Sequence, residues 1–182
     1  MYKIFKAQKV MAGIYTVTAV AVFIFALTFM TEYKDLFGLK LKQNSQISFF
    51  HDSVLQTFNR QIFVFALVGI LVILCSFLLE VFSKVPDRFA LMVMGALLIA
   101  CCGGAVYAIF NIQAIEAFYR TLDFQYLKLE GMADYKPHFA TFRIGTGIYI
   151  LQLAVCAGYM AAMVISHVQF IKNRKKGRME HE

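Results

Sequence analysis

Four long stretches without charged residues constrain this chain more than any other feature of its sequence. Between Lys9 and Glu32 there are 22 residues without Asp, Glu, Lys or Arg, and the intervals 61–79, 89–115 and 144–171 hold 19, 27 and 28 such residues. A bilayer core about 30 Å thick needs about 20 apolar helical residues to cross it. Lipid cannot hydrogen-bond irregular backbone, so spanning segments of this kind form helices. We therefore predict an all-α integral membrane four-helix bundle with spans near residues 10–31, 61–80, 88–113 and 144–170.

Composition excludes the main soluble classes. Hydrophobic residues make up 60% of the 182 positions and charged residues 16%, whereas soluble domains average about 45–50% and about 25%. An ordinary soluble enzyme, a coiled coil and a disordered chain do not fit these values. No Pro/Gly/Ser-rich linker divides the chain, so we expect a single membrane domain over residues 1–182. The first apolar run exceeds a usual signal-peptide core and lacks an A-x-A site, which indicates a retained span.

Basic residues predict the orientation. Ten Lys and Arg residues flank one side of the four spans and eight flank the other. The first set is the denser near the bilayer, because it includes the short 83–88 turn and the tail from Lys172 to Arg178. Since cytoplasmic flanks are enriched in Lys and Arg, we expect both termini in the cytoplasm and both long loops outside. A multi-pass protein of the plasma membrane, a bacterial inner membrane or its equivalent, fits this pattern.

The net charge of +7 does not indicate a nucleic-acid partner, because five of the basic residues directly follow the last span. They are expected to anchor the topology and to attract anionic lipid headgroups, at about 1 kcal/mol per basic residue near the surface.

Both outer loops are predicted to begin or end in helical extensions of the spans. Apolar residues at 47, 50, 54, 55 and 58 have helical spacing before span two. Ile112, Ile115, Phe118, Tyr119 and Leu122 continue span three in the same way. A break is expected near Gly131, with a new start after Pro137. At the inner turn, Pro86 suits the first helical position of span three.

Rows of small residues carry the most information about packing. In lipid, helices associate through close backbone approach at Gly, Ala and Ser rather than through hydrophobic burial. Two such rows have four-residue spacing: Ala96, Ala100, Gly104 and Ala108 in span three, and Ala154, Gly158, Ala162 and Ser166 in span four. The rows are widened by neighbouring small residues, which are Gly103 in span three and Ala157 and Ala161 in span four. Spans three and four are predicted to pack tightly, against each other or against a partner chain. A leucine at Gly104 or Gly158 is expected to disrupt assembly.

Aromatic residues are expected mainly at the periphery of the bundle. The faces of spans one and two are bulkier because they carry Phe23, Phe25, Phe63 and Phe65, and such faces suit lipid or an outer packing layer. Trp is absent, so Tyr and Phe are expected to form the interfacial belts. Phe118 and Tyr119 are among those placed at the outer edge.

Reactive groups are scarce within the spans. The four intervals contain no ionisable carboxylate or cation, and apart from Gln152 only a few hydroxyls lie deep. A polar route through one protomer is therefore poorly provided for. No glycine-rich phosphate loop, nucleophile elbow or H-E-x-x-H motif occurs, so no catalytic residue and no cofactor is assigned.

Four cysteines, Cys75, Cys101, Cys102 and Cys156, lie at membrane depth. Buried thiols behave as small hydrophobic groups, and without C-x-x-C spacing no metal or redox site is expected. The tripeptide Cys101-Cys102-Gly103 resembles the CCG signature of tetraspanins, which are four-span proteins with both ends inside. In that family the signature lies in a disulfide-bonded outer loop, whereas here it lies inside a span. The sequence is therefore assigned to no family.

Ionisable residues on the outer side form a candidate acid–base site, which consists of His51, Asp52, Glu116, Arg120 and His138. Their spacing is too scattered for a metal site, and solvated loop histidines are the simpler interpretation.

The function that these features favour is a non-catalytic membrane subunit. It would assemble with itself or with another membrane protein through the small-residue faces. Two alternatives stay open: a channel or transport component with its path at an oligomer axis, and a membrane enzyme that acts on a lipid-borne substrate at the outer interface.

Overall fold

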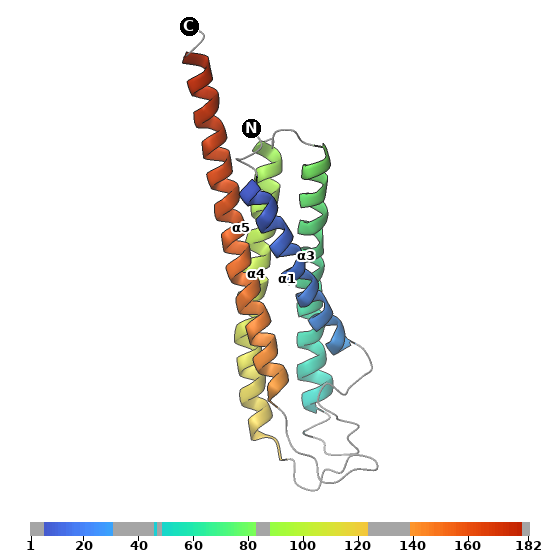
Figure 1. Ribbon diagram of the computed structural model, residues 1–182. Helices are drawn as coiled ribbons and strands as arrows, with labels where there is room; N and C mark the ends of the chain where they lie inside the picture. The colour runs from blue at the N-terminus through green and yellow to red at the C-terminus, as the bar shows by residue number, and fades with distance from the viewer. Residues whose placement is uncertain (1–5, 31–45, 47–48, 83–87, 124–138, 180–182) are drawn as a thin grey trace.

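A computed structural model describes residues 6–30, 46, 49–82, 88–123 and 139–179, and all of its elements are helices. The long helices are α1 (Lys6–Met30), α3 (Gln56–Phe82), α4 (Arg88–Thr121) and α5 (Ala140–Met179), and a six-residue π-helix, η1 (Phe50–Leu55), leads directly into α3 (Figure 1). Each long helix contains a segment long and apolar enough to cross a membrane. The predicted all-α, four-span fold is confirmed.

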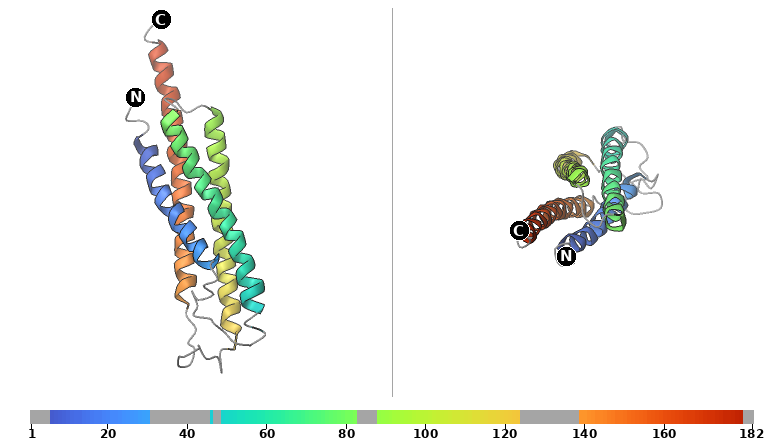
Figure 2. Two further views of the ribbon diagram at one scale, coloured as in Figure 1. Left: turned by 90° about the vertical axis from the view of Figure 1, so that its right-hand side faces the viewer. Right: turned by 90° about the horizontal axis from the view of Figure 1, so that it is seen from above.

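The four helices alternate in direction and form a closed ring of neighbours. Helix α1 packs against α3 and α5, and α4 packs against the same two helices (Figure 2). Helices joined in sequence are therefore adjacent in space, as in an up-down-up-down bundle. The start of α1 and the end of α5 lie at the same end of the bundle (Figure 1).

Alternating steps of three and four residues mark the core face of the helices. On α4 this buried row consists of Met94, Leu98, Cys101, Ala105, Ala108, Ile112, Ile115 and Tyr119, and Leu122 continues it just beyond the helix. On α5 the row consists of Gly145, Tyr149, Gln152, Cys156, Tyr159, Met163 and Ser166. A step that averages 3.5 residues keeps one side of a helix facing its neighbours in a left-handed bundle. The core thus runs the whole length of the molecule.

Two glycines receive phenylalanine rings from neighbouring helices. A β-carbon at Gly104 of α4 would lie 2.7 Å from Cγ and Cδ1 of Phe65 on α3, and one at Gly145 of α5 would lie 2.5 Å from Cζ of Phe25 on α1. Phe25 is buried, and Phe65 is half-buried. The assignment of these two rings to lipid or an outer packing layer was wrong, because the glycines leave room for them between the helices.

The helical extensions are confirmed at the end of the bundle where η1 and the end of α4 lie. Helix α4 continues to Thr121 and buries Ile115, Tyr119 and Leu122, while Phe50, Leu55 and Phe58 are buried where η1 meets α3. Tyr119 does not lie in an interfacial belt. It is fully buried, with ring centroids 5.6 Å from Phe50 and 5.4 Å from Phe142. The predicted features at Pro86, Gly131 and Pro137 lie outside the described residues.

The contrast between two nearby glycines of α5 tests this packing. The change Gly145→Ala should lower the free energy of unfolding by about 1–3 kcal/mol, since the new methyl group overlaps Phe25 and must displace it. At Gly147 a β-carbon meets no atom within 4 Å, so Gly147→Ala should be neutral or stabilise the helix by up to about 1 kcal/mol. Thermal unfolding in detergent, followed by circular dichroism, measures both. Equal melting temperatures for the two variants would contradict the close contact between the Phe25 ring and Gly145.

Candidate functional site

Polar side chains line much of the core face of α5, in the centre of the bundle. Tyr149, Gln152, Tyr159 and Ser166 are between 2% and 4% exposed, and Cys156 is fully buried. All five belong to the row with alternating three- and four-residue steps. The packing rows predicted from the sequence consisted of small residues at steps of four only, so the tyrosines of this row were not predicted.

Part of this polar centre is hydrogen-bonded between helices. The hydroxyl of Tyr15 on α1 donates to the carbonyl oxygen of Gly69 on α3 at 3.2 Å and lies 3.4 Å from Cys101 Sγ on α4. On the opposite side of Tyr15, the ring of Tyr159 lies 5.9 Å away, and its hydroxyl is 2.9 Å from Ser76 Oγ on α3. Interhelical bonds of this kind contribute about 0.6 kcal/mol each in membrane proteins. Together they connect all four helices near the bundle centre.

Other buried polar atoms of the core have no hydrogen-bond partner among the described residues. These atoms are Oδ1 and Nδ2 of Asn59, the hydroxyl oxygen of Tyr149 and Oε1 of Gln152. The other polar atom of Gln152, Nε2, donates to Cys156 Sγ at 3.6 Å. Asn59 is only 1% exposed. It precedes Arg60 and so falls outside the charge-free interval, which explains why the sequence analysis did not place it in the core.

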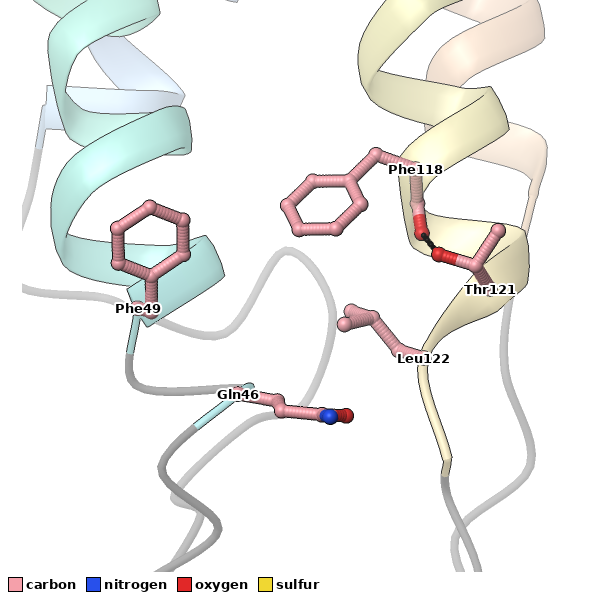
Figure 3. A pocket seen from close by; sticks show the side chains of 5 residues that line it. All are labelled: Gln46, Phe49, Phe118, Thr121 and Leu122. Carbon is pink, nitrogen blue, oxygen red and sulfur yellow. Dashed lines mark hydrogen bonds between the residues drawn. The ribbon is translucent and has the colours of Figure 1, made fainter.

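An apolar cleft of about 340 Å³ opens near the start of η1 and the end of α4. The rings of Phe49, just before η1, and Phe118 of α4 lie on opposite sides of it, and Leu122, Gln46 and Thr121 complete the lining (Figure 3). The volume falls in the lower range of small-molecule sites. These five described lining residues include no titratable side chain.

The structure brings together only two of the predicted outer-site residues in its described part. Glu116 and Arg120 form an ion pair of 2.6 Å on the surface of α4, and the Arg120 guanidinium also stacks 4.3 Å above the ring of Phe139. Asp52 is exposed on η1. The side chain of His51 and all of His138 lie outside the described residues. Glu116 is thus engaged by a cation one helical turn away.

The small-residue rows wind from the surface of each helix into the core. Ala96, Ala100 and Ala154 are exposed, Gly158 and Ala162 are half-buried, and the buried members are Gly104, Ala108 and Ser166. The reason is geometric: four residues advance an α-helix by about 40° more than one turn, so that three such steps rotate the row by about 120°. Each row therefore divides into a buried part and a surface part.

The buried part of the rows packs on α3 and α1. Gly104 faces Phe65 of α3, and a β-carbon at Gly158 would lie 2.9 Å from Met11 Cε on α1. Helices α4 and α5 are also direct neighbours.

All four cysteines are free, and the described residues contain no group of three or more His, Cys, Asp or Glu placed to hold a metal ion. Comparisons of the chain with protein-family models, curated proteins and solved structures find no match. The class that the fold defines is a multi-span helical membrane protein.

Replacement of Asn59 tests the cost of its buried amide. An unpaired buried polar group costs about 1–3 kcal/mol, so Asn59→Leu should raise the free energy of unfolding by a similar amount. Gln61→Leu is the control, because Gln61 is exposed and accepts a bond from Tyr107; that change should not stabilise the protein. Thermal unfolding in detergent compares the two variants. A lower melting temperature for Asn59→Leu would mean that the amide has a stabilising partner.

Proposed function

We propose that this protein is a non-catalytic membrane subunit that assembles with a second copy, or with another membrane protein, through the surface parts of its small-residue rows. The observation that carries the proposal is the different surroundings of two adjacent glycines. Gly104 is packed against Phe65, whereas a β-carbon at Gly103 would meet no atom within 4 Å. Gly103 is thus open to a neighbour from outside the bundle.

Two outward faces have this character. On α4, Gly103 shares a face with Ala96 and Ala100, and on α5 the exposed residues Ala154, Ala157 and Ala161 repeat at steps of three and four. Each face lies about two residues away from the core row, which places it on the opposite side of its helix. Small residues at these positions permit the close backbone contact by which helices associate in lipid.

Larger residues border the small ones on α4. Met92, Ile99 and Val106 are exposed beside the row, so that the surface alternates between a groove and ridges. The outward face of α3 differs, because it presents only larger side chains in the same region, among them Val64, Leu67, Leu71 and Leu74. A face of this second kind suits acyl chains, which supports assigning assembly to α4 and α5.

The two alternatives receive less support. A path at an oligomer axis depends on the same assembly and needs polar surface groups in addition. An enzyme at the outer interface would need reactive side chains at the cleft, whose lining is apolar or uncharged, and Glu116 is already paired with Arg120.

The end of α5 supports a second element of the proposal. The helix has 40 residues, about 60 Å at 1.5 Å per residue, and it extends beyond the other helices (Figure 1). The basic tail from Lys172 to Arg178 belongs to this extension. We assign it to the cytoplasmic side together with the N-terminus, where it would contact anionic lipid headgroups.

Leucine substitutions at the adjacent glycines separate assembly from folding. Gly103→Leu should leave the melting temperature of the protomer close to wild type but shift the particle from oligomer to monomer, because the side chain holds a neighbour away. Gly104→Leu should instead destabilise the protomer, since it collides with Phe65. Native mass spectrometry in detergent measures the particle mass, and circular dichroism measures the melting temperature.

Ala157→Leu provides the matching test on α5, and Val64→Leu on the outer face of α3 is the control that should change neither property. A wild-type protein that is strictly monomeric, with no partner retained from the native membrane, would overturn the proposal. Unchanged assembly in both Gly103→Leu and Ala157→Leu would also contradict it.

A further inference from the structure

A small cavity lies at the centre of the bundle, and all four helices line it. Its walls are mainly small residues, which are Ala19 of α1, Ala66 and Gly69 of α3, and Gly104 and Ala105 of α4. The space that can hold the centre of a water molecule is about 10 Å³. A single water needs a volume of about this size.

Tyr149 and Gln152 of α5 also line this cavity, and each has one buried polar atom without a hydrogen-bond partner among the described residues. Tyr149 is 2% exposed and Gln152 is 4% exposed, so bulk water reaches neither group. They are three positions apart, which places both side chains on one face of the helix. A donor and an acceptor thus border the same small space, and leaving both unsatisfied in the core of a membrane protein is costly.

We propose that this cavity is a binding site for one water molecule, held by Tyr149 and Gln152. The tyrosine hydroxyl donates a hydrogen bond to the water, and the water donates one to Oε1 of Gln152. Nε2 of Gln152 keeps its bond to Cys156 Sγ at 3.6 Å.

Water fits the site better than a cation does. The lining contains no carboxylate, so a sodium ion would bring an uncompensated charge into the centre of the bundle, at a large desolvation cost. The volume also excludes organic molecules. A neutral ligand of one oxygen atom that both donates and accepts hydrogen bonds remains, and water has these properties.

X-ray hydroxyl-radical footprinting of the protein in lipid nanodiscs tests the proposal, because X-rays generate radicals from bound water and so modify buried residues beside it. Tyr149 and Tyr159 form a matched pair: both lie on the core face of α5 and both are 2% exposed. Only Tyr149 lines the cavity. Tyr149 should be modified several-fold faster than Tyr159, as measured by mass spectrometry. Equal, slow modification of the two would show a dry cavity and overturn the proposal.

Two variants remove the site in different ways. Gly69→Ala fills the cavity without a collision, since its β-carbon would lie 3.5 Å from the Tyr15 hydroxyl and 3.9 Å from Ala19 Cβ. Gln152→Leu removes the acceptor while it keeps the side-chain size similar. Both should retain a cooperative melting transition and lose the fast modification of Tyr149. If that fast modification persists in both variants, the water lies elsewhere and the assignment fails.

The cation is tested separately by exchanging sodium chloride for choline chloride at equal ionic strength. A water site predicts the same melting temperature in both salts. A higher melting temperature in sodium chloride than in choline chloride, if the difference disappears in Gln152→Leu, would identify a bound cation and overturn the proposal.

Discussion

Close approach between helices is the constraint on which the rest of this structure depends. Because acyl chains are as apolar as leucine, burial against a neighbouring helix gains little in a bilayer, and contact must come from fitting shapes. Gly104 and Gly145 provide that fit, each receiving a phenylalanine ring from another helix. These two contacts join α4 to α3 and α5 to α1, which are two of the four neighbouring helix pairs in the ring.

The second constraint is the pairing of polar groups inside the bundle. Tyr15, Ser76, Cys101 and Tyr159 satisfy one another across four helices, whereas Tyr149 and Gln152 border a cavity and lack a protein partner for one atom each. Polar groups are more specific than apolar ones in a lipid-like core, because only one register of the helices brings a donor to its acceptor. The bond between Tyr159 and Ser76 thus favours one alignment of α5 along α3, while glycine and phenylalanine set the separation of the helices.

Small residues have two roles in this chain, and the turn of the helix assigns them. Gly104 and Ser166 face the core, but Ala100 and Ala154 face outward, although all four belong to the two small-residue rows in the sequence. The inward members hold the protomer together. The outward members remain as surface that no part of the described bundle covers, and this surface is the basis for proposing a subunit that assembles.

The sequence by itself determined the number of helices, their approximate bounds and their alternating direction, because a bilayer accepts only apolar helices of sufficient length. It also predicted the extension of α4 through Ile115 to Leu122. Only the tertiary structure decided which residues meet: that Phe25 and Phe65 turn inward, that Tyr119 is buried, and that Asn59 and the three tyrosines at 15, 149 and 159 form a polar core. The physical reason is that hydropathy reports whether a segment enters the membrane but is nearly the same on all sides of a helix there. Which side faces inward depends on the shapes and hydrogen-bonding groups of the other three helices.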